Sequence, residues 1–158
     1  MGEMRLGKGV EWAVHTLLNL NMAESGALGT PQLARAHDLP PAYLNKQLQL
    51  LVKAGLLVSS VGPHGGFSLA RPVEEITLLD VVLAIEGDEP MFRCEEIRCR
   101  GTIGELSPRP TGPCQVKSAM RRAERAWHEA LAGQKLADIQ AELDEEPAVR
   151  RIVRSALD

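Results

Sequence analysis

Residues 41–72 read PAYLNKQLQLLVKAGLLVSSVGPHGGFSLARP and contain, in order, the patterns of a helix, a strand, a turn and a returning strand. Pro41 suits the first turn of a helix, and Gly55 suits the position just past its end. Leucines recur at helical spacing between them and predict a buried stripe. LLVSSV and FSLARP then predict two strands joined by the glycine-rich turn GPHGG, which together form a β-hairpin.

Two further helices are expected before this stretch, one over residues 9–24 and a short one beginning at Pro31. Two short helices, a longer polar-faced helix and a hairpin are the order of a winged helix-turn-helix. A helix over 78–87 follows, then a long one from Cys114 to about Gly133 and two short ones divided at Pro147. The predicted fold class is mainly α with a small β-hairpin wing (α+β), with the long helix serving for dimerisation.

The third helix has a polar face without acidic residues, and such side chains can hydrogen-bond base edges and phosphates. An ordinary amphipathic surface helix would look similar, and the hairpin that follows is what favours DNA binding. Gln47 is placed on this face, and Gly66 is expected to let the hairpin tip approach phosphates. The expected DNA contacts are Ala42, Tyr43, Asn45, Lys46, Gln49, Lys53, His64 and Gly65.

The charge of the chain is compatible with DNA binding. The net charge is −3, but residues 1–72 carry six Lys/Arg against four Asp/Glu, and the remainder carries the acidic excess. No apolar run of about 18 residues could span a membrane, and the start of the chain lacks the apolar segment of a signal peptide. We therefore expect a cytoplasmic protein that does not bind membranes.

The three cysteines all lie in the segment 94–114, with the spacing C-x4-C-x14-C. In a cytoplasmic protein such a set is more typical of a metal site than of disulfides. An irregular loop allows thiolates to converge on a metal or cluster. A zinc site completed by a histidine is an alternative. No oxyanion-hole or substrate-pocket pattern accompanies the cysteines, so an enzyme is not expected.

Glu11 and His15 are four residues apart in the first predicted helix and therefore share one face. Trp12 lies beside them. From spacing alone, the two polar residues read as a solvated surface pair.

The chain resembles the Rrf-two family of bacterial transcription regulators. The resemblance rests on MRLGKGVEWAVHTLLNL, LPPAYLNKQLQLLVKAGLLVSS, GPHGGFSLARP, ITLLDVVLAIEG and the cysteine loop. It implies a winged-helix homodimer that binds double-stranded DNA at an inverted repeat. It also implies a division by role into a DNA-binding domain over 1–87, a cluster-binding loop over 88–114, and a dimerisation region over 115–158.

Within the family, the chain is most similar to redox-sensing members that hold a 2Fe–2S cluster between subunits. The implied ligands are Cys94 and Cys114 of one subunit with Glu11 and His15 of the other. Trp12 and His37 correspond to residues of the redox switch. DNA affinity would then depend on the redox state or presence of the cluster.

Several alternatives stay open. Cys99 could be a third cysteine ligand, as in a sensor of nitric oxide or iron status, and the cluster could be 4Fe–4S. The metal could also be zinc with a purely structural role.

Overall fold

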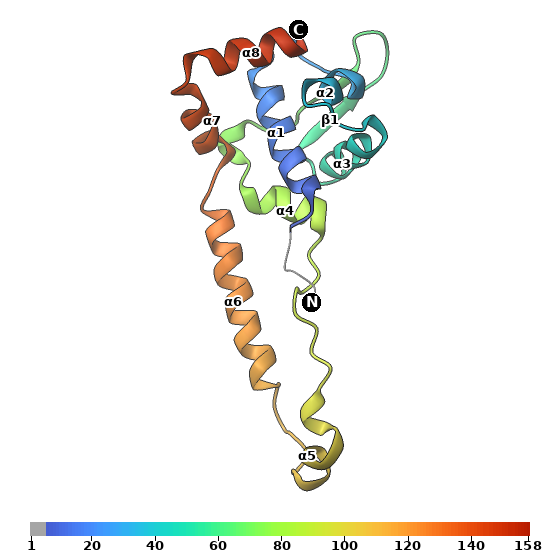
Figure 1. Ribbon diagram of the computed structural model, residues 1–158, viewed down its shortest axis with the longest axis vertical. Coiled ribbons are helices and arrows are strands. Elements are labelled where there is room, and N and C mark those ends of the chain that lie inside the picture. The colour runs from blue at the N-terminus through green and yellow to red at the C-terminus, as the bar shows by residue number, and fades with distance from the viewer. Residues whose placement is uncertain (1–5) are drawn as a thin grey trace. The chain divides into compact units, whose positions relative to one another are not determined.

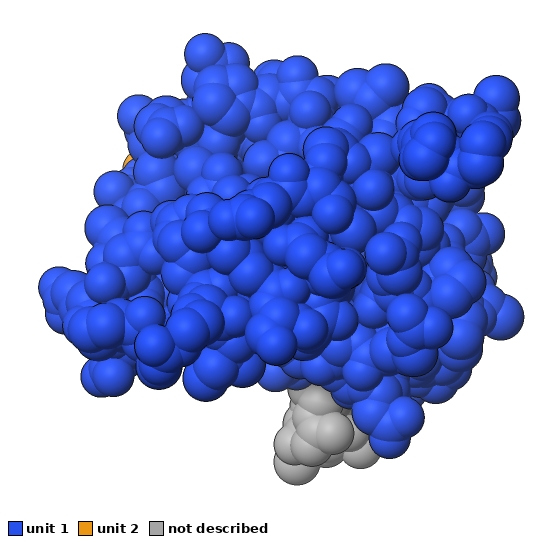
Figure 2. Space-filling model, turned by 90° about the horizontal axis from the view of Figure 1, so that it is seen from above, with its two compact units in different colours: residues 1–87, 131–158 blue, residues 88–130 orange. Residues whose placement is uncertain are grey.

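The computed structural model describes residues 6–158 (Figure 1), which form two compact units, and Figure 2 shows one face of the first. Among the described residues, the first unit comprises 6–87 together with 131–158, and the second comprises 88–130. The first part of the chain forms α1 (Lys8–Met22), α2 (Thr30–Ala36), α3 (Pro41–Lys53), β1 (Leu57–Ser60), β2 (Gly66–Leu69), the 3-10 turn η1 (Val73–Glu75) and α4 (Leu78–Glu86). It continues with η2 (Ile97–Cys99), α5 (Gly101–Leu106), α6 (Gln115–Ala132), α7 (Leu136–Asp144) and α8 (Pro147–Leu157).

The predicted winged helix-turn-helix is confirmed. Strands β1 and β2 pair antiparallel, with Leu57 opposite Leu69 and Ser60 opposite Gly66. An additional antiparallel bridge joins Leu28, in the loop before α2, to Phe67 in β2. The wing is therefore attached by backbone hydrogen bonds to the segment that leads into the helix-turn-helix.

The core of the first unit is built from the leucine stripes visible in the sequence. Leu17 of α1 and Leu44, Leu48 and Leu51 of α3 are fully enclosed. Removing a side chain of this size from water is worth about 1.5–3 kcal/mol. At the start of α4, Thr77 accepts a hydrogen bond from the backbone of the third helical residue, which satisfies one of the free N–H groups there.

Gly66 is required by the packing of the wing. A Cβ at this position would lie 2.5 Å from the carbonyl carbon of Leu28, and its φ of +143° is unusual for other residues. From the sequence, this glycine was expected to let the hairpin tip approach DNA phosphates. The structure gives it a role within the fold, because it lets the wing backbone pass close to the loop before α2.

The last two helices belong to the first unit. Leu136 and Leu157 lie in its core, and the amide of Leu136 donates to the carbonyl of Ile76 over 2.9 Å. The split at Pro147 is as predicted. Packing thus places 131–158 with the winged helix, while the division by role at residues 87 and 114 stays a prediction.

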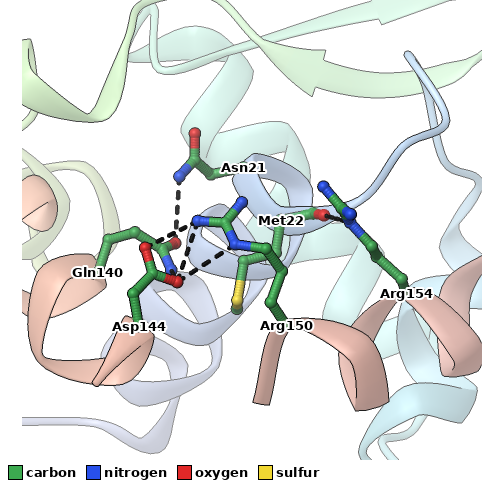
Figure 3. A network of polar contacts seen from close by, with 6 residues as sticks. All are labelled: Asn21, Met22, Gln140, Asp144, Arg150 and Arg154. Carbon is green, nitrogen blue, oxygen red and sulfur yellow. Dashed lines mark hydrogen bonds and ion pairs between the residues drawn. The ribbon is translucent and has the colours of Figure 1, made fainter. Parts of the chain in front are cut away.

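Polar contacts also attach these helices to α1 (Figure 3). Asn21 donates to Gln140 over 3.1 Å, and Gln140 in turn donates to Asp144. Arg150 of α8 donates to both carboxylate oxygens of Asp144, and Arg154 donates to a main-chain carbonyl at the end of α1. The network connects α7, α8 and the end of α1.

The second unit has a different character. None of its residues is buried, and α6 exposes apolar side chains such as Val116, which is 60% exposed. Within residues 88–130, α5 lies between the stretch that contains Cys94 and the beginning of α6 (Figure 1). No helix in residues 6–158 has the length and apolar character needed to cross a membrane.

Candidate functional site

The predicted DNA-contacting residues of α3 lie on one solvent-exposed face, which Gln47 does not share. Gln47, which the sequence placed on this face, is only 5% exposed and packs against Gly9 of α1. Its Oε1 has no hydrogen-bond partner in the described residues. Its position in the helix lies on the same buried side as the leucine stripe. Because the side chain is polar, sequence analysis placed it on the exposed face instead. The exposed candidates are Ala42, Tyr43, Asn45, Lys46, Gln49 and Lys53.

Asn45 is held in place by the preceding helix. The hydroxyl of Thr30, the first residue of α2, donates to Oδ1 of Asn45 over 3.1 Å. The amide NH₂ of Asn45 keeps its donors, and an amide so oriented is suited to read a base edge. No sequence pattern indicates this contact between α2 and α3.

The wing tip presents a smaller set of contacts. His64 is exposed, and Gly65 is partly covered. A Cβ at Gly65 would collide with the backbone of Ser60, so this glycine is also explained by the turn itself. Val61 is fully exposed at the tip.

An aromatic pair joins α1 to the first turn of α3. The rings of Trp12 and Tyr43 meet edge to face, with centroids 5.1 Å apart and planes at 81°. The ammonium of Lys8 lies 5.4 Å from each ring centroid, within range of a cation–π interaction. The sequence predicted roles for both aromatic residues separately and did not reveal that they touch.

Glu11 and His15 are both exposed on α1. The ring of His15 lies 5.6 Å from that of His37, centroid to centroid. Nε2 of His37 lies 2.9 Å from the amide nitrogen of Asn19. An amide nitrogen can only donate, so Nε2 of His37 is the acceptor in this contact. Burial, followed by the neighbouring His15, lowers the pKa of His37, which agrees with the neutral form.

The structure brings Cys94 and Cys114 together in the second unit, while Cys99 is exposed. Cys114 directly precedes α6. The backbone N–H of Lys117 lowers the pKa of the Cys114 thiol most, and the N–H of Val116 and a hydrogen bond with Cys94 act in the same direction. Helix N-termini stabilise thiolates in this way, and the thiolate is the form that binds metals.

The described residues of one chain contain no group of three His, Cys, Asp or Glu side chains placed to hold a metal ion. The three cysteines are therefore not gathered as a zinc or three-cysteine site in residues 6–158. The implied ligands lie in pairs instead, with Glu11 and His15 in the first unit and Cys94 and Cys114 in the second.

Comparison with known proteins identifies the family. Residues 6–142 match Rrf2, described as an iron-dependent transcriptional regulator. The chain belongs to the Rrf2 family. It is 35% identical over 136 residues to protein aau3 of Rhizobium meliloti, covering 86% of this chain and 84% of that protein. It is also 34% identical to the HTH-type transcriptional regulator YffB of Lactococcus lactis, covering 86% of each.

Solved structures of this Rrf2-family fold agree with the architecture. CymR, the global cysteine regulator of B. subtilis, superposes with a TM-score of 0.64 at 20% identity, covering 90% of this chain and 98% of that one. IscR of T. potens gives the same TM-score at 22% identity, covering 92% and 91%. The chain is thus a DNA-binding transcriptional regulator and not an enzyme, as predicted.

Proposed function

We propose that this Rrf2 regulator is a homodimer that binds an inverted-repeat operator and changes its affinity with the redox state or presence of a 2Fe–2S cluster. In this proposal it is a regulator of the RsrR type. Cys94 and Cys114 of one subunit and Glu11 and His15 of the other would hold the cluster. The observation that carries the proposal is the contact between Trp12 and Tyr43. Trp12 lies beside the proposed ligands in α1, and Tyr43 lies on α3, the helix with the predicted DNA contacts.

The donor set suits such a cluster. Cys94 and Cys114 are adjacent, and the start of α6 favours the thiolate of Cys114. Imidazole and carboxylate are harder ligands than thiolate, and the i, i+4 spacing lets Glu11 and His15 reach one ion. When bound, a 2Fe–2S cluster supplies one-electron chemistry at a potential that its ligands and surroundings set.

The coupling to DNA would pass through α1. A change of charge at Glu11 and His15 acts on the turn of α1 that holds Trp12. Because Trp12 packs on Tyr43 at the first turn of α3, a shift of the indole changes the support of the DNA-facing helix. A difference of about 1.4 kcal/mol between states is enough for a tenfold change in affinity.

The test compares Trp12→Leu with Trp127→Leu, a tryptophan of α6 in the second unit. Operator affinity of oxidised, reduced and cluster-free protein is measured anaerobically at one salt concentration. Trp12→Leu should keep the visible spectrum and narrow the gap between the oxidised and reduced forms, and Trp127→Leu should keep the gap. Equal affinity of all three wild-type forms would refute the sensing role.

The DNA-facing assignments predict two different mutational signatures. Lys46→Ala and Lys53→Ala should weaken binding to all sequences and flatten its salt dependence, since they remove phosphate contacts. Asn45→Ala should relax the preference at one base pair, at a cost of about 1–3 kcal/mol. Thr30→Val should give a milder version of the Asn45→Ala effect, because it removes only the group that orients the amide.

The role of Cys99 separates the cluster types. Cys99→Ser should retain the colour, and Cys94→Ser or Cys114→Ser should be colourless. Loss of colour in Cys99→Ser would favour a three-cysteine cluster of the kind that senses nitric oxide or iron status, or a 4Fe–4S cluster. A colourless wild-type protein that retains zinc would favour the structural alternative.

A further inference from the structure

Arg98 makes more polar contacts than any other side chain of the cysteine loop. It lies in η2, between Cys94 and Cys99. Its guanidinium donates to the carbonyl of Gly112 over 2.6 Å and to Oε1 of Gln115 over 3.3 Å. It also pairs with Glu96.

These partners lie on the two stretches of chain that carry the adjacent cysteines. Gly112 and Gln115 flank Cys114, while Arg98 and Glu96 follow Cys94. One planar guanidinium therefore connects the two stretches, and its fixed set of donors suits such bridging better than an ammonium would.

We propose that Arg98 is a positioning residue for the cluster. It holds together the two stretches that carry Cys94 and Cys114 before the cluster binds, and its charge favours the reduced, more negative state once the cluster is bound. This rests on the proposed function for its second part only, because the spacing of the two thiols is a property of the cluster-free chain.

The backbone conformation of Glu96 and the low exposure of Arg98 support an ordered contact between these two residues. Glu96 adopts φ +54° and ψ +44°, a left-handed conformation that non-glycine residues rarely take without compensation. Its carboxylate pairs with the guanidinium. The Arg98 side chain is only 24% exposed, whereas Arg93 in the same loop is 81% exposed and pairs with Glu89 alone among the described residues.

The electrostatics point the same way. The guanidinium is close enough for the thiols of Cys114 and Cys99 to raise the pKa of Arg98, although Glu96 raises it most. A fixed positive charge near a cluster ligand stabilises the added electron and so raises the reduction potential.

The spacing is tested on cluster-free protein in a Cys99→Ser background, where only Cys94 and Cys114 remain. Phenylarsine oxide, which binds two neighbouring thiols, is the probe. Arg98→Ala and Arg98→Lys should each lower its affinity about tenfold, and the control Arg93→Ala should not change it. Circular dichroism checks that the first unit of each variant is folded.

The charge is tested on reconstituted protein by an anaerobic redox titration. Arg98→Ala should lower the potential by about 59 mV, the equivalent of a tenfold change for one electron. Arg98→Lys keeps the charge and should stay close to wild type, as should Arg93→Ala. A merely structural role of Arg98 would not separate the lysine variant from the alanine variant in this way.

The outcomes distinguish the two proposals. If wild type takes up a cluster, but Arg98→Ala equals it in arsenical affinity and in potential, the role of Arg98 is refuted and the proposed function stands. If wild type takes up no cluster, the proposed function fails, and the arsenical comparison still decides whether Arg98 positions the thiols.

Discussion

The two compact units of this chain differ in how they are held together. The first encloses all of the buried apolar side chains of the described residues, from Val10 to Leu157. The second, residues 88–130, encloses none and exposes Ile97, Ile103 and Leu106 around its cysteines. Burial of apolar surface is the main driving force of folding. The first unit therefore has a core of its own, whereas residues 88–130 are joined by local polar contacts such as those of Arg98 and Glu124.

The largest difference should appear in unfolding. Leu48→Ala removes a fully buried side chain of α3 and should lower the free energy of unfolding by about 2–5 kcal/mol. Ile103→Ala, at a position 69% exposed, should change it by less than about 0.5 kcal/mol. Urea denaturation followed by circular dichroism measures both. Similar losses in the two variants would mean that the second unit has a core after all.

The apolar stripe of α6 should matter for association more than for folding. Met120→Gln places a polar group on the exposed stripe and should weaken the proposed dimer at least tenfold, since burying such a side chain is worth about 1.5–3 kcal/mol. Glu129→Gln, on an exposed part of the same helix, is the control. Sedimentation velocity gives the dissociation constants. If Met120→Gln dimerises like wild type, the stripe is not the dimer contact.

A third comparison lies within the first unit, between two glycines. Gly66→Ala forces a Cβ against the backbone of Leu28 at a positive φ and should cost about 1–3 kcal/mol. Gly26→Ala meets no atom within 4 Å and should be neutral, or stabilise by up to about 1 kcal/mol. Thermal unfolding of the two variants gives the comparison. An unchanged Gly66→Ala variant would show that the wing can shift away from the loop before α2.

The smallest effect should be a pH dependence of the stability that the polar network between α1, α7 and α8 contributes. Hydrogen bonds from Arg150 hold the pKa of Asp144 below its ordinary value. A carboxyl with a depressed folded-state pKa contributes stability above its unfolded pKa of about 3.9, and this is lost as the pH falls through the folded value. Asp144→Asn should thus be less stable than wild type at pH 7, with the difference vanishing in acid.

The control for this measurement is Glu145→Gln, which removes the exposed carboxylate next in sequence. Its stability difference from wild type should not follow the same course with pH. If the Asp144→Asn difference persists unchanged below pH 3, the pair with Arg150 does not supply it.

The sequence predicted the elements of the first unit well, because each depends on local signals. The leucine spacing of α3, Pro41 at its start and the glycine-rich turn of the wing are all short-range features. The cap of α4 is equally local, because Thr77 is of a residue type that is favoured just before the first turn of a helix. The same local reasoning placed Gln47 on the exposed face, where its polar side chain outweighed its position in the helix.

Sequence patterns did not predict contacts between residues that are far apart along the chain. The meeting of Trp12 with Tyr43, the orientation of Asn45 by Thr30 and the bridging by Arg98 depend on how elements pack. No sequence pattern around Arg98 predicts which residues it contacts. The pairing of Cys94 with Cys114 as cluster ligands was implied by a family resemblance and stays a prediction, with the Cys94 thiol near enough to Cys114 to lower its pKa.

The return of α7 and α8 to the core also bears on the order of folding. The bridge between Thr77 and Lys135 and the burial of Leu157 mean that the core is completed by residues made after the cysteine loop. Non-local contacts of this kind slow folding, because a long intervening segment must be brought round before they form. During synthesis on the ribosome, the winged helix would emerge first. The surface of α1 that packs against α7 and α8 would stay exposed until those helices are made. The cysteine loop would be fully synthesised before residues 131–158 complete the core of the first unit.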